Sequence, residues 1–180
     1  MCGIFGFTGE VINPSQNLKI MGNALLHRGP DGEGYFIDKS ISMGMKRLSI
    51  LDIENGNQPF MSDDKSIVTI CNGEIYNYLA LKKELIKKGY IFKTNNDVEV
   101  IPSMYKEYGI EFVNKLNGMF AIALYDLKKS IFYLIRDRLG IKPLYYTIIK
   151  NKMVFASEIK PIISSGLVEI EINVESIDSF

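Results

Sequence analysis

The chain has 180 residues, 47% of them hydrophobic, and its 21 Lys and Arg residues balance its 21 Asp and Glu residues. These values predict one folded domain with a sizeable core, and a neutral chain has no global charge to attract nucleic acid or anionic lipid. The two Cys and one His are too few for a disulfide framework or a zinc site.

The N-terminal segment Met1–Ile4 lacks the basic stretch of a secretory signal. No apolar run approaches the roughly 18 residues that span a bilayer. We therefore expect a cytoplasmic protein with neither a membrane partner nor a nucleic-acid partner.

A series of short apolar runs rich in β-branched and aromatic residues predicts strands along the whole chain. Several runs are separated only by short turn segments, such as 127–130 and 150–152, which favours antiparallel hairpins over βαβ crossovers. The expected strands are Cys2–Thr8, Gly34–Ile37, Ile41–Leu51, Ile67–Cys71, Tyr90–Phe92, Met119–Leu127, Ile131–Arg136, Leu144–Ile149 and Met153–Ala156.

Helical spacing of apolar residues occurs in the segments Gln16–Leu26, Leu79–Lys88 and Val98–Tyr108. Pro102 lies inside the third segment, where it predicts either a bend or a later start of the helix. Together the elements predict an α+β protein in which helices cover the faces of antiparallel sheets.

Cys2 is the first candidate for catalysis. The initiator Met is commonly removed when the next residue is small, which would leave Cys2 with a thiol and a free α-amine whose reference pKa is about 7.7–8.0. That amine can take the thiol proton, so an N-terminal nucleophile needs no His. In the alternative interpretation, Cys2 packs as a small hydrophobic residue, and a chain that keeps Met1 has no free amine here.

Asn72 and Gly73 follow an apolar strand that ends in Cys71, which we interpret as a buried residue without a catalytic role. The Asn72 side-chain amide and the Gly73 N–H can converge on a developing oxyanion, where each donor contributes roughly 2.7–4 kcal/mol. Asn-Gly is also the commonest tight hairpin turn. The helical pattern after Tyr78 weakens that alternative, because a hairpin requires a returning strand.

Arg47 and Asp97 form a third candidate pair. An Arg can hold a carboxylate and an Asp can hold an ammonium, so together they suit the two charges of an amino-acid backbone. The alternative interpretations are a solvated Arg at a strand end and an Asp that caps a helix.

Motifs along residues 1 to about 165 together resemble the glutaminase domain of glutamine-dependent asparagine synthetases, which are class II glutamine amidotransferases. The segment His27–Gly32 resembles the asparagine-synthetase branch of that class. The resemblance rests on Met1–Ile4, His27–Gly32, Arg47–Asp52, Asn72–Asn77, Asp97–Ile101, Gly118–Ala121, Arg136–Tyr146 and Ala156–Lys160.

The resemblance implies an N-terminal-nucleophile hydrolase fold, an αββα sandwich of two antiparallel sheets between helical layers. It assigns residues 1–165 to the amidotransferase domain. Residues 166–180 would begin a linker or a truncated synthetase domain, because the chain ends at Asp178-Ser179-Phe180 in what resembles the start of a helix.

The resemblance also implies a role for each candidate residue. Cys2 would attack the glutamine side-chain amide, and Asn72 with Gly73 would form the oxyanion hole. Arg47 would bind the substrate carboxylate, while Asp97 and Glu74 would bind its ammonium. Backbone groups of Leu48, Ser49, Ile50 and Leu51 would line the pocket.

The same resemblance limits what this domain does alone. Relatives often carry His at the positions of Met45 and Tyr78, which affects the surroundings of the pocket. The chain lacks the Ser-Gly-Gly type of pyrophosphate signature, so no cofactor or metal is expected here, and ATP and Mg²⁺ would bind the absent synthetase domain.

The expected partners are glutamine, a C-terminal synthetase domain and a second copy of the full-length enzyme. Three alternatives remain open. They are an asparagine-synthetase-like enzyme with another acceptor, another Cys-dependent amidase, and a catalytically silent binding or regulatory module.

Overall fold

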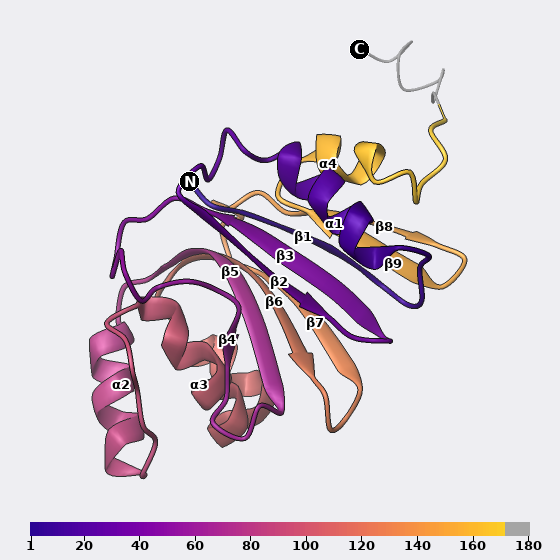
Figure 1. Ribbon diagram of the computed structural model, residues 1–180. Helices are drawn as coiled ribbons and strands as arrows, with labels where there is room; N and C mark the ends of the chain where they lie inside the picture. Colours follow the sequence, from indigo (N-terminus) through magenta and orange to yellow (C-terminus); the bar gives the residue numbers. More distant parts are fainter. Residues whose placement is uncertain (172–180) are drawn as a thin grey trace.

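Two antiparallel β-sheets lie face to face in the computed structural model, which describes residues 1–171 (Figure 1). The five-stranded sheet has the order β2-β3-β1-β9-β8, and the four-stranded sheet has the order β4-β5-β6-β7. The strands are β1 (Gly3–Thr8), β2 (Gly32–Ile37), β3 (Ile41–Arg47), β4 (Phe60–Met61), β5 (Ile67–Ile75), β6 (Gly118–Asp126), β7 (Ile131–Arg136), β8 (Tyr145–Ile149) and β9 (Lys152–Ala156).

Helices cover the outer face of each sheet (Figure 1). Helices α1 (Pro14–Asn23) and α4 (Ile159–Ser164) pack on the five-stranded sheet. Helices α2 (Tyr78–Lys87) and α3 (Val100–Tyr108), with the 3-10 helices Asp97–Glu99 and Gly109–Lys115, pack on the four-stranded sheet. The predicted α+β architecture of four layers is therefore confirmed.

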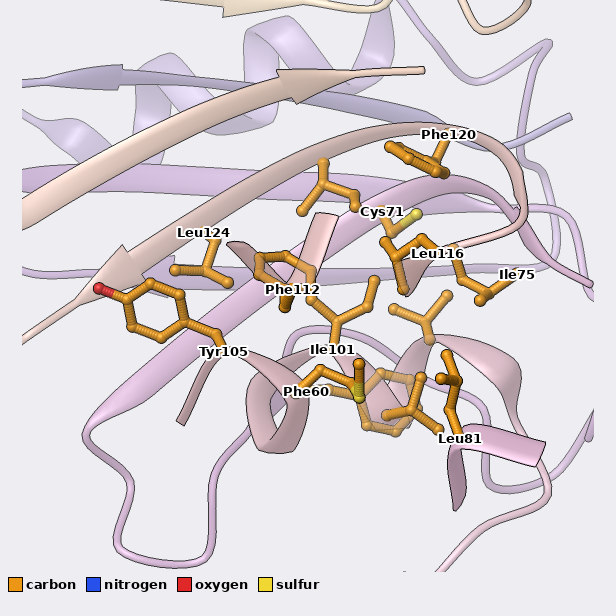
Figure 2. Packing of buried hydrophobic residues seen from close by; sticks show 14 of the residues in the cluster. Phe60, Cys71, Ile75, Leu81, Ile101, Tyr105, Phe112, Leu116, Phe120 and Leu124 are labelled. Carbon is orange, nitrogen blue, oxygen red and sulfur yellow. The ribbon is translucent and has the colours of Figure 1, made fainter. Parts of the chain in front are cut away.

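Alternation along the strands divides the core into three layers. In β1, Ile4 packs between the sheets, whereas Phe5 and Phe7 pack under α1 and α4. In β5, Val68 and Ile70 face the other sheet, and the next layer lies under α2 and α3 (Figure 2). From β5 that layer receives Ile67, Cys71 and Ile75.

The Asn72-Gly73 pair lies inside β5, so the hairpin-turn interpretation is wrong. The strand continues to Ile75, and Gly73 pairs with Phe120 of β6. A Cβ atom on Gly73 would lie 2.2 Å from the carbonyl oxygen of Met119, so no larger residue fits this pairing. The close contact between β5 and β6 explains the glycine without a turn.

Most predicted elements agree with the structure within a few residues, but two predicted strands differ and one strand was missed. Tyr90–Phe92 forms no strand, because Tyr90 and Phe92 pack instead against the layer under α2 and α3. The predicted strand Ile41–Leu51 ends at Arg47, which leaves the backbone of 48–51 outside the sheet. The two-residue strand β4 was missed because it is too short to show alternation.

The helices also differ in detail from the prediction. The first helix begins at Pro14, because Pro suits a first helical position, and it ends at Asn23. The third helix begins at Val100 after the 3-10 helix Asp97–Glu99, so Pro102 falls in its first turn. Helix α4 was missed because its six residues span fewer than two turns.

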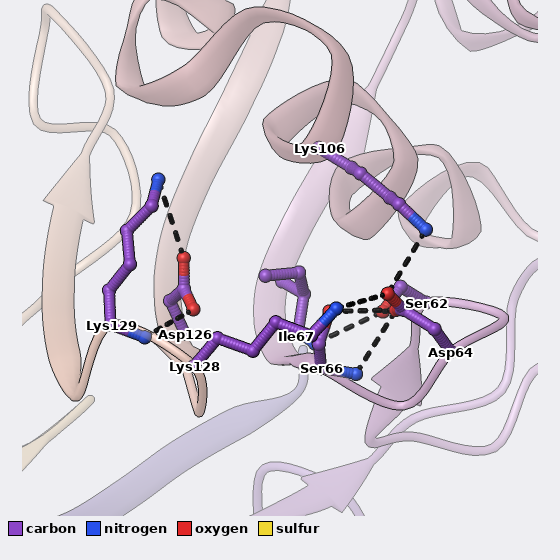
Figure 3. A network of polar contacts seen from close by, with 8 residues as sticks. All are labelled: Ser62, Asp64, Ser66, Ile67, Lys106, Asp126, Lys128 and Lys129. Atoms are coloured by element: carbon purple, nitrogen blue, oxygen red, sulfur yellow. Dashed lines mark hydrogen bonds and ion pairs between the residues drawn. The ribbon is translucent and has the colours of Figure 1, made fainter.

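Asp64 anchors the turn between β4 and β5 (Figure 3). Its carboxylate accepts hydrogen bonds from the hydroxyls of Ser62 and Ser66, both at 2.7 Å, and pairs with Lys106 of α3 and with Lys128. These contacts, the Ser66 hydroxyl foremost, hold the pKa of Asp64 far below its usual range. The network thus fixes one end of β5, and Gly73 lies near the other end.

The domain boundary predicted at residue 165 remains a prediction. Residues 172–180 of the predicted linker, including Asp178-Ser179-Phe180, lie outside the described residues. Within residues 1–171, no helix is both long enough and apolar enough to cross a membrane.

Candidate active site

One cavity brings together most of the residues predicted to form the site. It lies where β1, β3 and β5 meet the loop after β3 and the 3-10 helix Asp97–Glu99. The predicted residues that line it are Cys2, Arg47, Leu48, Ile50, Leu51, Gly73, Glu74 and Asp97. Asn72 and Ser49 are not among its lining residues, and the Ser49 N–H donates to Asp31 at 2.8 Å.

Cys2 is held at the cavity by backbone contacts. Its Sγ atom accepts a hydrogen bond from the Leu48 N–H at 3.4 Å and lies 3.6 Å from the Leu48 carbonyl oxygen. The register of β1 with β3, in which Gly3 pairs with Lys46, sets this position. The Cys2 carbonyl accepts from Arg28 Nε at 3.0 Å, so the thiol and the backbone of Cys2 are both fixed.

Glu158 braces Arg28 in turn. Its Oε1 atom lies 2.9 Å from an Arg28 nitrogen and 3.0 Å from His27 Nε2. Burial alone would raise the pKa of Glu158, but the hydrogen bonds from Arg28 and His27 outweigh it and lower that pKa. The segment His27–Gly32 thus contacts Cys2 through Arg28.

Asn72 carries a buried amide nitrogen, Nδ2, that has no hydrogen-bond partner among the described residues. Leaving such a donor unpaired costs about 1–3 kcal/mol. By strand alternation Asn72 lies on the same face of β5 as Ile70, which belongs to the same core cluster as Ile4 of β1. An unpaired donor beside the N-terminal strand is suited to a charge that develops only during a reaction.

The peptide N–H of Gly73 points toward the cavity edge of the sheet. Phe120, its partner on β6, uses its own N–H and carbonyl for Asp137, at 3.2 and 2.8 Å. Because both backbone groups of Phe120 point away from β5, Gly73 and Phe120 form a pair of the antiparallel ladder without mutual hydrogen bonds. The Gly73 N–H therefore points to the edge of β5 that faces away from β6. Strand β4 covers this edge of β5 only at Val68 and Thr69. The part of the edge at Gly73 is therefore not covered by β4, and it borders the cavity.

Arg47 is buried, so its interpretation as a solvated residue is wrong. Its two terminal nitrogens donate to the carbonyl oxygens of Leu51, Asp52 and Ile53 and to the Asn57 side chain, at 2.7–3.0 Å. Arg47 therefore shapes one wall of the cavity by holding the loop 51–57. Its contact with a substrate carboxylate remains a prediction.

Asp97 is buried beside the end of β5. Its Oδ2 atom accepts from the Ile75 N–H at 2.6 Å, and burial raises the pKa of its carboxyl group. The helix cap is instead Asn96, whose side chain accepts from the Val98 N–H at 3.0 Å, so the interpretation of Asp97 as the cap is wrong. Asp97 and Glu74 are thus available in one cavity for a positively charged ligand group.

Four further lining residues, Gln58, Cys71, Asn96 and Val98, were not predicted, and two of them, Gln58 and Asn96, have amide side chains. The Gln58 side chain accepts from the Cys71 N–H at 2.6 Å and donates to the Cys71 carbonyl at 3.1 Å. It thus makes the hydrogen bonds to β5 that a neighbouring strand would make. The Asn96 amide donates to the Leu51 carbonyl at 3.3 Å. No local sequence signal marks either residue, because both partners are distant in the chain.

The expectation of no metal or cofactor is untested. Residues 1–171 contain no group of three or more His, Cys, Asp or Glu side chains placed to hold a metal ion. The side chains with polar groups that line the cavity are two cysteines, Arg47, two amides and two carboxylates.

The glutamine amidotransferase domain family matches residues 1–180. Asparagine synthetase [glutamine-hydrolyzing] 2 of Bacillus subtilis is 48% identical over 91% of this chain and 22% of its own length, and its paralogue 1 is 41% identical over 100% and 29%. The amidase chyE of Penicillium rubens is 40% identical over 78% of this chain and 21% of its own length. The chain thus spans less than a third of the length of each of these three relatives.

The fold is similar to that of glutamine phosphoribosylpyrophosphate amidotransferase from B. subtilis. The two chains superpose with a TM-score of 0.76 at 23% identity, over 92% of this chain and 44% of the other. This likeness confirms the fold predicted for an N-terminal-nucleophile hydrolase.

Proposed function

Since the chain belongs to the glutamine amidotransferase domain family, we propose that its cavity hydrolyses the side-chain amide of glutamine through Cys2. One observation carries the proposal: the buried, unpaired Asn72 amide and the outward N–H of Gly73 lie on the strand that borders the Cys2 cavity. Two donors near a nucleophile form an oxyanion hole.

The chemistry begins after removal of Met1. The α-amine of Cys2 takes the thiol proton, and the thiolate attacks the amide carbon, so that negative charge develops on the amide oxygen. Asn72 and Gly73 donate hydrogen bonds to that oxygen. Proton transfer from the α-ammonium to the amide nitrogen releases ammonia and leaves a thioester, which water hydrolyses to glutamate.

Substrate recognition uses the charged residues of the cavity. Asp97 and Glu74 bind the α-ammonium of glutamine, and the positive charge of Arg47, whose terminal N–H groups hold the loop 51–57, attracts its carboxylate. Backbone groups of the segment 48–51 line the pocket between these charges. The raised pKa of Asp97 reflects a buried carboxylate that gains a counter-charge when the substrate binds.

The acceptor of the ammonia lies outside this chain. Relatives named as glutamine-hydrolysing asparagine synthetases support a synthetase domain that forms asparagine as the partner. We further propose that this domain uses ATP and Mg²⁺ to amidate aspartate and that the full-length enzyme forms homodimers. A relative named as an amidase supports the alternative of a different acceptor. Two free cysteines favour a reducing compartment such as the cytoplasm.

Intact mass and ammonia release, measured on the same sample, test the proposal. A glutamine-like diazoketone should add mass to the peptide that begins with Cys2 and leave the Cys71 peptide unmodified. Cys2→Ala should abolish both labelling and ammonia release, and Cys71→Ala should keep both.

Ammonia release that persists in the Cys2→Ala variant would contradict the proposal. A folded, Met1-free protein that neither reacts nor turns over would instead indicate a binding or regulatory module. Turnover of another amide without glutamine hydrolysis would indicate a different amidase.

A further inference from the structure

Lys142 is a buried lysine in the segment between β7 and β8, with 5% of its surface exposed. Its Nζ atom contacts the Met1 thioether sulfur at 3.2 Å. Among residues 1–171, no carboxylate lies within ion-pair distance of this ammonium. Buried lysines are almost always paired, so this one calls for an explanation.

The position of Lys142 is fixed by its own turn. The Asp137 carboxylate accepts the N–H groups of Leu139, Ile141 and Lys142 at 2.9–3.1 Å, and Arg136 donates to the Lys142 carbonyl at 2.7 Å. Burial alone would raise the pKa of Asp137, but these backbone N–H groups lower it. Asp137 is therefore held by the backbone, and its carboxylate makes no ion pair with Lys142.

The ammonium lies beside the N-terminus of the nucleophile. Met1 is the residue joined to the Cys2 nitrogen, and its side chain occupies the space next to Nζ. Removal of Met1 would free the Cys2 nitrogen as an α-amine next to the space that the Met1 side chain and Lys142 share. The same charge reaches the cavity, because it opposes the rise in the pKa of Cys71 that burial causes.

Other charged groups near Cys2 already have partners or assigned roles. Arg28, which donates to the Cys2 carbonyl, is paired with Glu158, and Glu158 also contacts His27. Across the cavity, Asp97 and Glu74 are assigned to the substrate ammonium. Arg47, which also lines the cavity, donates only to neutral groups and is assigned to the substrate carboxylate. Lys142 is therefore the cation next to Met1 that has neither a carboxylate partner among the described residues nor an assigned role.

We propose that Lys142 is a positioning residue for the catalytic base, because its charge keeps the α-amine of Cys2 neutral and able to accept the thiol proton. This inference rests on the proposed function. A neighbouring positive charge disfavours a second one, so the amine gives up its proton more readily. The same repulsion favours transfer of the proton from the α-ammonium to the amide nitrogen as the carbon–nitrogen bond breaks.

Titration of the α-amine by ¹⁵N NMR tests the inference directly, in the Met1-free full chain labelled with [¹⁵N]cysteine. Lys142→Met removes the charge at similar volume and should raise the titration midpoint by about one pH unit or more. Lys142→Arg keeps the charge and should leave the midpoint nearly unchanged. Lys39→Met makes the same change at an exposed turn between β2 and β3 and serves as the matched control.

The pH profile of kcat/KM for glutamine gives the second measurement. In Lys142→Met the acidic limb should move to higher pH by the same interval, and activity should recover at alkaline pH. A uniform loss at every pH, or an unchanged NMR midpoint, would overturn the inference. If Lys142→Met does not fold, judged by circular dichroism, Lys142→Gln takes its place.

The two measurements separate this inference from the proposed function. The NMR titration needs no turnover, so a shifted midpoint without ammonia release would contradict only the glutaminase proposal. Ammonia release with an unshifted midpoint would contradict only the role of Lys142.

Discussion

The thiol of Cys2 accepts a hydrogen bond from the backbone N–H of Leu48, at 3.4 Å. Leu48 is the first residue after β3, where the chain leaves the sheet and begins the loop that lines the cavity. One contact therefore joins the nucleophile to the start of the substrate loop. Changes that loosen this loop should affect the binding of substrate and the position of the thiol together.

Replacing Asn72 with Ala should reduce kcat for glutamine hydrolysis by about 10²–10³-fold, with a much smaller change in KM. The reason is that an oxyanion donor acts mainly in the transition state. Steady-state measurement of ammonia release checks this prediction.

Asn77→Ala is the matched control for Asn72. The Asn77 side chain bonds the backbone of Lys115 and Asn117, at 2.9 and 3.0 Å, so its loss should lower the melting temperature and spare kcat. Equal losses of kcat in the two variants would contradict the assignment of Asn72.

Gly73→Ala should destabilise the protein by about 1–3 kcal/mol or more, because the added Cβ would lie 2.2 Å from the Met119 carbonyl oxygen. Gly32→Ala should be tolerated, since its Cβ would meet nothing closer than 3.5 Å. Urea unfolding of both variants measures the difference. Equal stability would show that β6 can move away from β5 at no cost.

Arg47→Lys should weaken the substrate loop, although it conserves charge. An ammonium cannot replace the four hydrogen bonds that Arg47 donates to the loop 51–57. We expect a rise in KM for glutamine and faster proteolytic cleavage within 48–57. Cleavage at the wild-type rate, with KM raised, would indicate that Arg47 acts only on the substrate.

Asp97→Asn should raise KM for glutamine about tenfold or more, because the ammonium loses a charged partner. Its effect on stability should depend on pH. Burial raises the pKa of Asp97 in the folded state, so the folded protein binds this proton more tightly and wild-type stability falls as pH rises through that pKa. The stability difference between wild type and Asp97→Asn should therefore shrink from about pH 4 upward.

Thermal unfolding across this pH range measures the effect of Asp97→Asn. Asp38→Asn is the matched control, because Asp38 is exposed in the turn between β2 and β3. A difference that grows with pH would contradict the assignment of a raised pKa to Asp97.

Sequence patterns predicted the strands that have several alternating residues, such as β6 and β7, because local alternation is enough to identify them. The same patterns failed where the structure of a segment depends on packing against distant residues. Tyr90–Phe92 has strand-like residues but no neighbouring strand, and the Asn72-Gly73 pair has turn-like residues but lies within β5. Asn96 and Asp97 are adjacent and equally suitable as the helix cap by sequence. In the structure Asp97 accepts from the Ile75 N–H, and Asn96 caps the helix.

The sequence by itself determined the family and the two antiparallel sheets with their helices, because these depend on local patterns and on motifs in a fixed order. The same motifs gave Cys2, Asn72 and Gly73 as the candidates for the nucleophile and the oxyanion donors. Only the tertiary structure decided which groups are paired. It left the Asn72 amide without a partner, engaged Arg47 with its own loop, and placed the unbalanced charge of Lys142 beside Met1. Hydrogen bonding and burial depend on residues that are distant in the chain, and no local pattern encodes them.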